Sequence, residues 1–563
     1  MIDKFKNIFS AKRFSIIFLA VSLLLTLFVL YTPMPVAKDN KTAFSAIRAA
    51  EHIENISREP HSYYDRVEHE RVRQYLIETL SNYLGSTNVS EHTYSIEDTK
   101  NTVKAINQEK NKLAYDPEKV LYDIQNVMGV LKGKSEKGIL LVAHYDSRGH
   151  VGRYGEQGRS YGAMDDGYGV GSMLELAFLF KNQNPENSIY FLFTDAEEVD
   201  LFGAIMASKD VSIMKNINFT INLESRGRYG ATYMFETSNN NSKVIDLYKK
   251  ASLPVSYSMA TAVYSVMPNF TDFTPFVEAG SPGMNFATLA GLDNYHSPLD
   301  RYENIELSSI QHMGVQVEPI IKEFISDSKY VTDNYFESNN NQVFFTIFTD
   351  VIITYSYPVA IILAIIALIS LVGVFALKTK ERSIDKTLVT NVLLKGLGLS
   401  VIMIIGALLY SNIVAFIGKV PFSVTYTRVS NTEVPTFLLM ALATLVLFIK
   451  IRKSDSNKVL LVGTTVNVVL ALLTTFTLEG ASFLFTITSL FGIVAILTDY
   501  INSKLAKKII LGFSYLVLLL LIMPLLYSFY MALTVGGVVV LVVLLILNGV
   551  VTLPIIMKQF SVE

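Results

Sequence analysis

The sequence predicts an α/β domain, folded as a three-layer α/β/α sandwich with a mixed central sheet, and a multi-span α-helical membrane domain. Short apolar runs alternate with helical patterns after residue 117, which is typical of a layered α/β fold. Long apolar runs occur near the amino terminus and from about residue 344 onward. With 563 residues, 50% of them hydrophobic, and a mean hydropathy of +0.36, the chain is too long for one domain and too apolar for a wholly soluble protein.

The amino-terminal segment is predicted to cross a membrane once. Residues 1–13 contain four basic side chains and would form a cytoplasmic amino terminus. Residues 14–31 are apolar and just long enough to span a bilayer. Pro35-Val36-Ala37 is a poor signal-peptidase site, so we expect an uncleaved signal anchor.

Residues 32–341 are the predicted extracytoplasmic domain. Helical patterns at 44–56 and 68–84 lead into a polar, charged region, and the alternating strands and helices follow. The last helix of the domain is predicted at 303–325. A segment rich in Asn, Asp and Ser, 330–341, then links the domain to the membrane.

Residues 342–563 are predicted to form a membrane domain with about seven transmembrane helices. The apolar spans lie at roughly 352–377, 389–417, 435–449, 459–478, 481–497, 509–527 and 532–557. Basic clusters occupy every second junction, which places those junctions in the cytoplasm, both termini inside and the α/β domain outside. The span centres carry no charged residue, so an anchor is favoured over a transporter, with an oligomerisation platform or a substrate guide as alternatives.

Composition excludes several classes of function. The formal net charge of −2 gives no reason to expect a nucleic-acid partner. The chain has no cysteine, so disulfides, thiolate metal sites and a cysteine nucleophile are excluded. An exported domain without disulfides favours a prokaryotic cell membrane as its location.

Metal-binding side chains follow the predicted strands and precede one helix. They are His144 and Asp146 after the strand at 138–143, Asp165 and Asp166 before the helix from Gly167, Glu197 and Glu198 after 188–193, Glu224 after 217–223, and His296 in a loop after 284–288. The carboxyl ends of parallel strands meet at one edge of a sheet, so these side chains are expected to converge.

The mixture of imidazole and carboxylate groups favours a site for two divalent cations. Zinc accepts both ligand types, and two metals need one bridging carboxylate. Without cations, so many acids in one crevice would repel one another. Asp146 could accept the second ring N–H of His144, and either Glu197 or Glu198 could ligate while the other acts as general base. Zinc is the expected metal, with cobalt or manganese as alternatives.

Five motifs resemble zinc metallopeptidase family 28, the co-catalytic dizinc aminopeptidases. They are HYDS at 144–147, AMDDG at 163–167, DAEE at 195–198, NLES at 222–225 and YHSPLD at 295–300. The upstream segments 43–57 and 68–85 are similar to helices of the membrane-bound subgroup, the vacuolar membrane proteases or Fxna-like peptidases. The sequence departs from the family in two places: Glu224 stands where soluble members usually have aspartate, and REPHSYYD at 58–65 lacks the usual Gly-Ser.

The resemblance implies a role for each site residue. Asp165 would bridge two zinc ions, and the other four ligands would be His144 and Glu224 on one ion and Glu198 and His296 on the other. It also implies Glu197 as general base, Asp146 as the partner of His144, Tyr295 as a donor to the oxyanion, and a cis peptide bond between Asp165 and Asp166.

The predicted function is therefore that of an outward-facing, membrane-anchored, two-zinc exopeptidase, an aminopeptidase that uses a metal-bridging hydroxide. Its partners would be a peptide or aminoacyl substrate and the lipid bilayer, and a homo-oligomer is left open. The alternatives are a glutaminyl cyclase-like acyltransferase with one zinc ion, a catalytically silent receptor or scaffold of the same fold, and transport by the membrane half.

Overall fold

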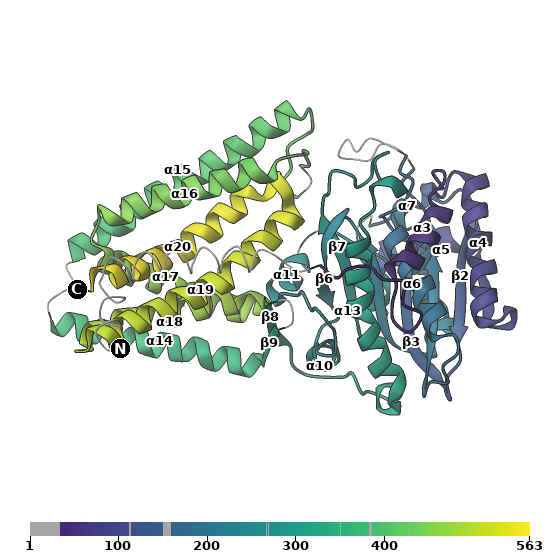
Figure 1. Ribbon diagram of the computed structural model, residues 1–563, viewed down its shortest axis with the longest axis horizontal. Helices are drawn as coiled ribbons and strands as arrows, with labels where there is room; N and C mark the ends of the chain where they lie inside the picture. The colour runs from purple at the N-terminus through teal and green to yellow at the C-terminus, as the bar shows by residue number, and fades with distance from the viewer. Residues whose placement is uncertain are drawn as a thin grey trace. The chain divides into compact units, whose positions relative to one another are not determined.

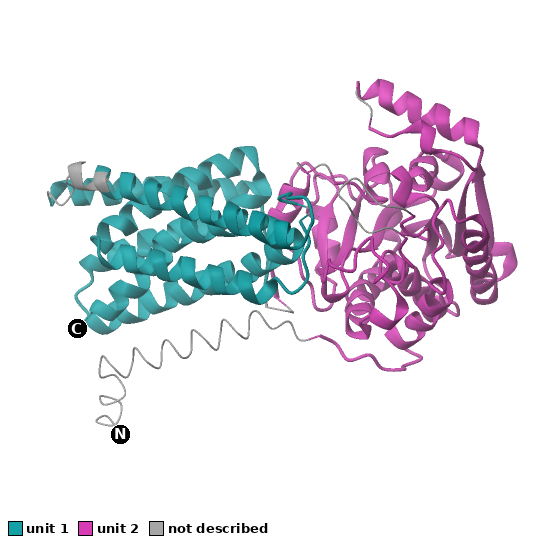
Figure 2. Ribbon diagram, turned by 90° about the horizontal axis from the view of Figure 1, so that it is seen from above, with its two compact units in different colours: residues 1–32, 343–348, 353–563 teal, residues 33–342, 349–352 magenta. Residues whose placement is uncertain are grey.

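The computed structural model describes residues 34–562, apart from 112–113, 150–158, 266, 268, 349–350, 382–385 and 426. The predicted signal anchor at 14–31 lies outside the described residues. The chain divides into two compact units: an α/β unit, residues 33–342 with 349–352, and a helical unit that includes 353–562 (Figure 2).

The α/β unit is built on a seven-stranded mixed sheet with the strand order β1-β2-β4-β3-β5-β7-β6. Strands β2, β3, β6 and β7 of this sheet are labelled in Figure 1. The strands are β1 Val89–Tyr94, β2 Ile124–Leu131, β3 Ser135–His144, β4 Asn187–Thr194, β5 Ile217–Ser225, β6 Tyr229–Thr237 and β7 Gly283–Ala290. The four central strands β4, β3, β5 and β7 run parallel, whereas β1, β2 and β6 pair antiparallel. The predicted mixed sheet is confirmed.

Helices cover both faces of this sheet. One layer contains α3 Ala46–Ile56, α4 Arg66–Leu84, α6 Gly167–Phe180 and α13 Leu307–Ser326, and the other contains α5 Ile96–Glu109, α8 Phe202–Lys209 and α12 Phe273–Glu278. Leu140 and Val142 of β3 pack with Ala204 of α8 and Phe276 of α12. The alternate residues of β3 are buried on the other face, which explains the continuous apolar run in the sequence.

Shorter elements complete the α/β unit. They are α7 Glu197–Asp200, α9 Val211–Met214, α10 Ser242–Tyr248 and α11 Ser258–Tyr264. The predicted helices at 44–56, 68–84 and 303–325 correspond to α3, α4 and α13. The polar region between α4 and residue 117 forms β1 and α5, for which the sequence analysis predicted no regular structure.

In the part of the helical unit that the structure describes, there are seven long helices. They are α14 Tyr357–Lys380, α15 Lys386–Ile417, α16 Glu433–Arg452, α17 Ser456–Thr477, α18 Ser482–Leu497, α19 Lys504–Leu533 and α20 Val538–Ser561. Among the described residues, six apolar segments are long enough to cross a membrane, and the last of them, Lys504–Ser561, contains both α19 and α20. The strands β8 Gln342–Phe348 and β9 Val351–Ser356 form a two-stranded sheet, so α14 begins five residues later than the span predicted from 352.

Candidate metal centre

The predicted ligands lie at the carboxyl ends of the parallel strands. His144 is the last residue of β3 and pairs with Thr194, the last residue of β4. Glu224 is the penultimate residue of β5, which lies on the other side of β3. Glu197 and Glu198 begin α7, three residues after β4. The parallel register thus brings segments separated by up to eighty residues to one edge of the sheet.

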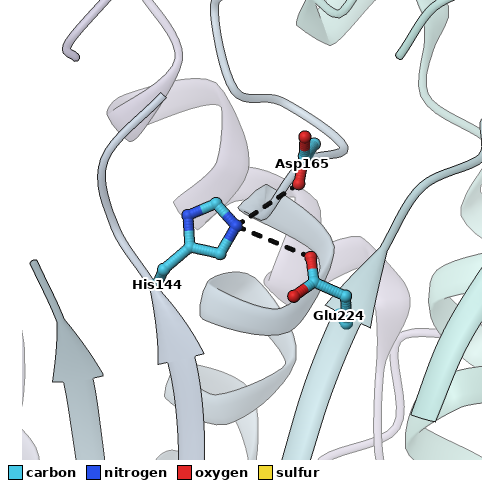
Figure 3. A group of neighbouring side chains, drawn as sticks. All are labelled: His144, Asp165 and Glu224. Atoms are coloured by element: carbon cyan, nitrogen blue, oxygen red, sulfur yellow. Dashed lines mark hydrogen bonds and ion pairs between the residues drawn. The ribbon is translucent and has the colours of Figure 1, made fainter. Parts of the chain in front are cut away.

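The first group of candidate ligands consists of His144, Asp165 and Glu224 (Figure 3). Nε2 of His144 lies 3.3 Å from Oδ1 of Asp165 and 3.5 Å from Oε1 of Glu224. All three residues are buried. Nδ1 of His144 donates a hydrogen bond to the backbone carbonyl of Asp146 at 2.9 Å. With Nδ1 held by this carbonyl, Nε2 faces the two carboxylates, which is the position from which it would bind a cation.

The second group consists of Asp165, Glu198 and His296. Nε2 of His296 lies 3.1 Å from Oδ2 of Asp165 and 3.1 Å from Oε2 of Glu198. Asp165 therefore belongs to both groups and directs one oxygen toward each histidine. A carboxylate placed in this way has the geometry of a bridge between two cations.

The loop that carries Asp165 is fixed from the opposite side by Asp300. Its carboxylate accepts hydrogen bonds from the backbone N–H of Met164 at 2.6 Å and from the hydroxyl of Ser160 at 2.6 Å. The peptide bond between Asp165 and Asp166 is cis, as predicted. Asp166 is in neither group, because its side chain caps α6 by accepting the N–H of Gly169 at 3.1 Å.

The environment of Asp146 differs from the prediction in one detail. Its backbone carbonyl, rather than its carboxylate, is the nearer acceptor for His144, since the carboxylate oxygen lies 3.6 Å from Nδ1. The carboxylate instead accepts the backbone N–H groups of Glu197 at 2.9 Å and Glu198 at 3.3 Å. Asp146 thus joins the end of β3 to the first turn of α7, and its contact with the imidazole is secondary.

Electrostatic repulsion among the acids is strong when no cation is present. Burial raises the pKa of Glu197 well above its ordinary value, and the charges of Glu224 and Glu198 add to this increase although His144 opposes it. Burial also raises the pKa of Glu224. By contrast, burial acts to raise the pKa of Asp165, but His144 and His296 together outweigh burial and lower that pKa. Divalent cations between these groups would relieve the repulsion.

The donor set fits metal ions. Oδ2 of Asp165 and Oε1 of Glu198 are buried, and neither accepts a hydrogen bond from any described residue. A buried carboxylate oxygen without a partner is costly, so such atoms indicate that a ligand or ion belongs there. Carboxylate is a hard ligand and imidazole a ligand of intermediate softness. Zinc, cobalt and manganese accept both.

The sequence pattern of peptidase family M28 matches residues 126–320, a range that contains every candidate ligand. This part of the chain is a peptidase family M28 domain. The M28 domain is also similar to curated proteins named vacuolar membrane protease. The relative from Schizosaccharomyces pombe is 28% identical over 289 residues, which cover 50% of this chain and 32% of the relative. The relative from Candida dubliniensis is 28% identical over 269 residues, which cover 46% of this chain and 26% of the relative.

The matched part spans about a third or less of these two relatives. Both relatives are fungal, so they give no support to the predicted prokaryotic membrane.

Among solved structures, the zinc aminopeptidase from Bacillus subtilis is 17% identical with a TM-score of 0.37, covering 53% of this chain and 99% of its own. The glutaminyl cyclase from Porphyromonas gingivalis is 19% identical with a TM-score of 0.38, covering 50% of this chain and 99% of its own.

Two tyrosines lie near the candidate ligands of the M28 domain. The ring of Tyr295 stacks on the imidazole of His296, with centroids 3.7 Å apart. Tyr264 in α11 was not predicted as a site residue. Burial raises its pKa well above the ordinary value; the charge of Glu236 and then those of Glu224 and Glu197 add to the increase, although Arg226 opposes it. Its hydroxyl therefore stays protonated and lies within the electrostatic field of the site.

Two further side chains of the α/β unit, one of them in α4 and so outside residues 126–320, contact the segment after β4. Arg148 donates hydrogen bonds to the backbone carbonyl of Glu198 at 2.7 Å and to its Oε2 at 3.1 Å. Asp195 accepts hydrogen bonds from Nε2 of the buried His69 at 2.8 Å and from the backbone N–H of Gln125 at 2.9 Å. The sequence analysis assigned no role to Arg148 or His69. Arg148 directly follows the HYDS motif at 144–147, and His69 lies in the upstream segment 68–85.

Proposed function

We propose that this protein is a membrane-anchored two-zinc aminopeptidase that acts at the outer face of its membrane. The observation that carries the proposal is the position of Asp165, whose two carboxylate oxygens point to two different histidines. A single-metal site would need only one of the two groups of ligands. The two groups share Asp165 and are otherwise separate, which favours a pair of cations.

Each ion would have one histidine, one glutamate and the shared aspartate. His144 and Glu224 would hold the first ion, Glu198 and His296 the second, and Asp165 both. When bound, the ions would polarise the scissile carbonyl and lower the pKa of a water molecule. Arg148 would keep Glu198 in place, because it contacts both the main chain and the side chain of that residue.

Glu197 is the proposed general base. It is in neither ligand group, yet its Oε2 lies 3.9 Å from Nε2 of His144. The adjacent Glu198 faces the second group, so the two neighbours are free to take different roles. Glu197 would accept a proton from the attacking water and pass it to the leaving amine. Two tyrosines are candidate donors to the oxyanion. They are Tyr264, whose hydroxyl feels the charges of Glu236, Glu224 and Glu197, and Tyr295, whose ring stacks on His296; we take Tyr264 as the first candidate.

The membrane placement is also a proposal. Helices α14 to α20 would cross the bilayer, with the basic ends of α14 and α16 and the basic start of α19 in the cytoplasm. With the predicted span at 14–31, this arrangement puts both termini inside and the M28 domain outside. The chain would then be anchored through its carboxyl-terminal helices.

Metal content and product analysis on the full chain test the proposal. We expect about two zinc ions per chain, release of free amino acids from unblocked peptides, no hydrolysis of amino-terminally acetylated peptides, and loss of activity with a chelator. Asp165→Asn should lose both ions, whereas Asp166→Asn should keep them, because that neighbouring acid only caps α6. One ion per chain together with cyclisation of glutaminyl peptides would indicate an acyltransferase instead.

A further inference from the structure

A cavity of about 400 Å³ lies within the helical unit, between α15, α16, α17 and α20. Figure 1 shows these helices side by side. Most of the cavity wall is aliphatic, formed by residues such as Leu399, Met403, Leu447, Val459 and Val550. A cavity of this size is within the range of small-molecule and lipid-chain sites.

Three lysines line one end of the cavity. They are Lys395 on α15, Lys450 on α16 and Lys453 at the end of α16. All three are exposed, and no ion pair or hydrogen bond of their ammonium groups occurs among the described residues. Asp455 also lines the cavity but lies 3.7 Å from Lys458 and caps α17. Three lysines and one aspartate give this end a formal charge of +2.

The aliphatic wall extends from the lysines toward the centre of the helices. From Lys395 to Met403, α15 rises about 12 Å, and from Val459 to Val466, α17 rises about 10 Å. Half of a bilayer's hydrocarbon core is about 15 Å thick. The cavity therefore has the depth of one leaflet, with its charged end at the surface and its apolar wall inside.

The spacing of the helices leaves an open space between α15 and its neighbours. At Gly463, α17 approaches α20 so closely that a Cβ would lie 2.7 Å from the carbonyl oxygen of Val550. At Gly396, which faces the same cavity from α15, a Cβ would meet nothing within 4 Å. The floor of the cavity is thus tightly packed, whereas the α15 side is open.

We propose that this cavity binds an anionic phospholipid of the cytoplasmic leaflet, with its headgroup phosphate at Lys395, Lys450 and Lys453 and part of an acyl chain along the aliphatic wall. The unpaired lysines match the phosphate in charge, and the apolar wall matches the chain. The basic clusters at the same helix ends place the lysines on the cytoplasmic side, where anionic lipids are concentrated. This inference rests on the membrane placement proposed above but not on the peptidase chemistry, so lipid binding and hydrolysis can fail separately.

Native mass spectrometry of the full chain from detergent micelles tests the inference. The probes are dioleoyl phosphatidylglycerol and dioleoyl phosphatidylcholine, which share acyl chains but differ in net charge. We expect one tightly retained phosphatidylglycerol and little phosphatidylcholine. A lysine near an anionic lipid contributes about fivefold in affinity, so replacing three should weaken phosphatidylglycerol binding about a hundredfold. The variant is K395Q/K450Q/K453Q.

The matched control removes the same charge from another cytoplasmic cluster. In K504Q/K507Q/K508Q, at the start of α19, binding should change less than threefold. Gly396→Trp, which keeps all the lysines but fills the cavity, should also abolish retention. Equal loss in the two triple variants, equal retention of both lipids, or normal binding by Gly396→Trp would overturn the proposal. The helical circular dichroism signal and its thermal transition in detergent report that the helical unit of each variant is folded.

Discussion

Replacing Glu197 by glutamine should separate its role from that of the metal ligands. Glutamine has the same shape and leaves the backbone N–H of residue 197 on the carboxylate of Asp146, at 2.9 Å in the structure. Glu197 belongs to neither ligand group, so the metal content should stay near two ions per chain. Only the proton acceptor is lost. A positioned general base contributes about 10²- to 10⁴-fold to the rate. Loss of Glu197 should therefore raise the activation barrier by about 3 to 5 kcal/mol.

The assay compares steady-state rates on an aminoacyl anilide with zinc content measured on the same protein. Glu198→Gln is the matched control, because Glu198 is the adjacent residue and contacts His296 at 3.1 Å. We expect this control to lose metal occupancy as well as activity. If Glu197→Gln lost zinc while Glu198→Gln retained it, the two roles would have to be exchanged. Near-normal kcat in Glu197→Gln would refute the assignment of the base altogether.

Three further predictions concern residues around the site and in the core. If Tyr264 donates to the oxyanion, Tyr264→Phe should lower kcat by about 10²-fold, and Tyr295→Phe should lower it much less. A larger loss of kcat in Tyr295→Phe would reverse the assignment. Asp146→Asn should lower kcat about tenfold to a hundredfold and reduce thermal stability, because each carboxylate oxygen accepts one N–H of α7 and asparagine replaces one of these oxygens by an NH₂ group, which cannot accept. Burial lowers the pKa of His312 to about 4, below its ordinary value near 6.5, so the free energy of unfolding should decrease as the pH falls from about 6.5 to about 4, by on the order of 3 kcal/mol. In His312→Gln, the midpoint of thermal unfolding should depend less on pH over this interval, and an unchanged dependence would contradict the pKa shift.

The core of the α/β unit was predictable because its strands are buried on both faces. Ile139 to Ala143 read as a continuous apolar run, and in the structure alternate residues pack against opposite helix layers. A strand of this kind is conspicuous in a sequence. An edge strand is much harder to recognise in a sequence, as β1 Val89–Tyr94 shows. Ser90 to Thr93 are polar and no residue of the strand is buried, so the sequence carries no apolar periodicity from which β1 could be recognised.

The candidate ligands were predictable for the same reason, since each lies next to a conspicuous strand or helix. The residues that hold those ligands in place could not be predicted in this way. Asp300 fixes the Asp165 loop across 135 residues of sequence, and Arg148 contacts the main chain and side chain of Glu198 across 50 residues. Their positions depend on how loops fold over the end of the sheet, which periodicity does not encode.

Asp146 illustrates the limit of spacing arguments at short range. Only one residue separates it from His144. This spacing places the two close together, but it does not decide whether the carbonyl or the carboxylate accepts the imidazole proton. The structure uses the carbonyl for His144 and reserves the carboxylate for the start of α7. One aspartate thereby couples a ligand on β3 to the proposed base on α7. A substitution there should disturb both metal binding and proton transfer, whereas Glu197→Gln should disturb only the second.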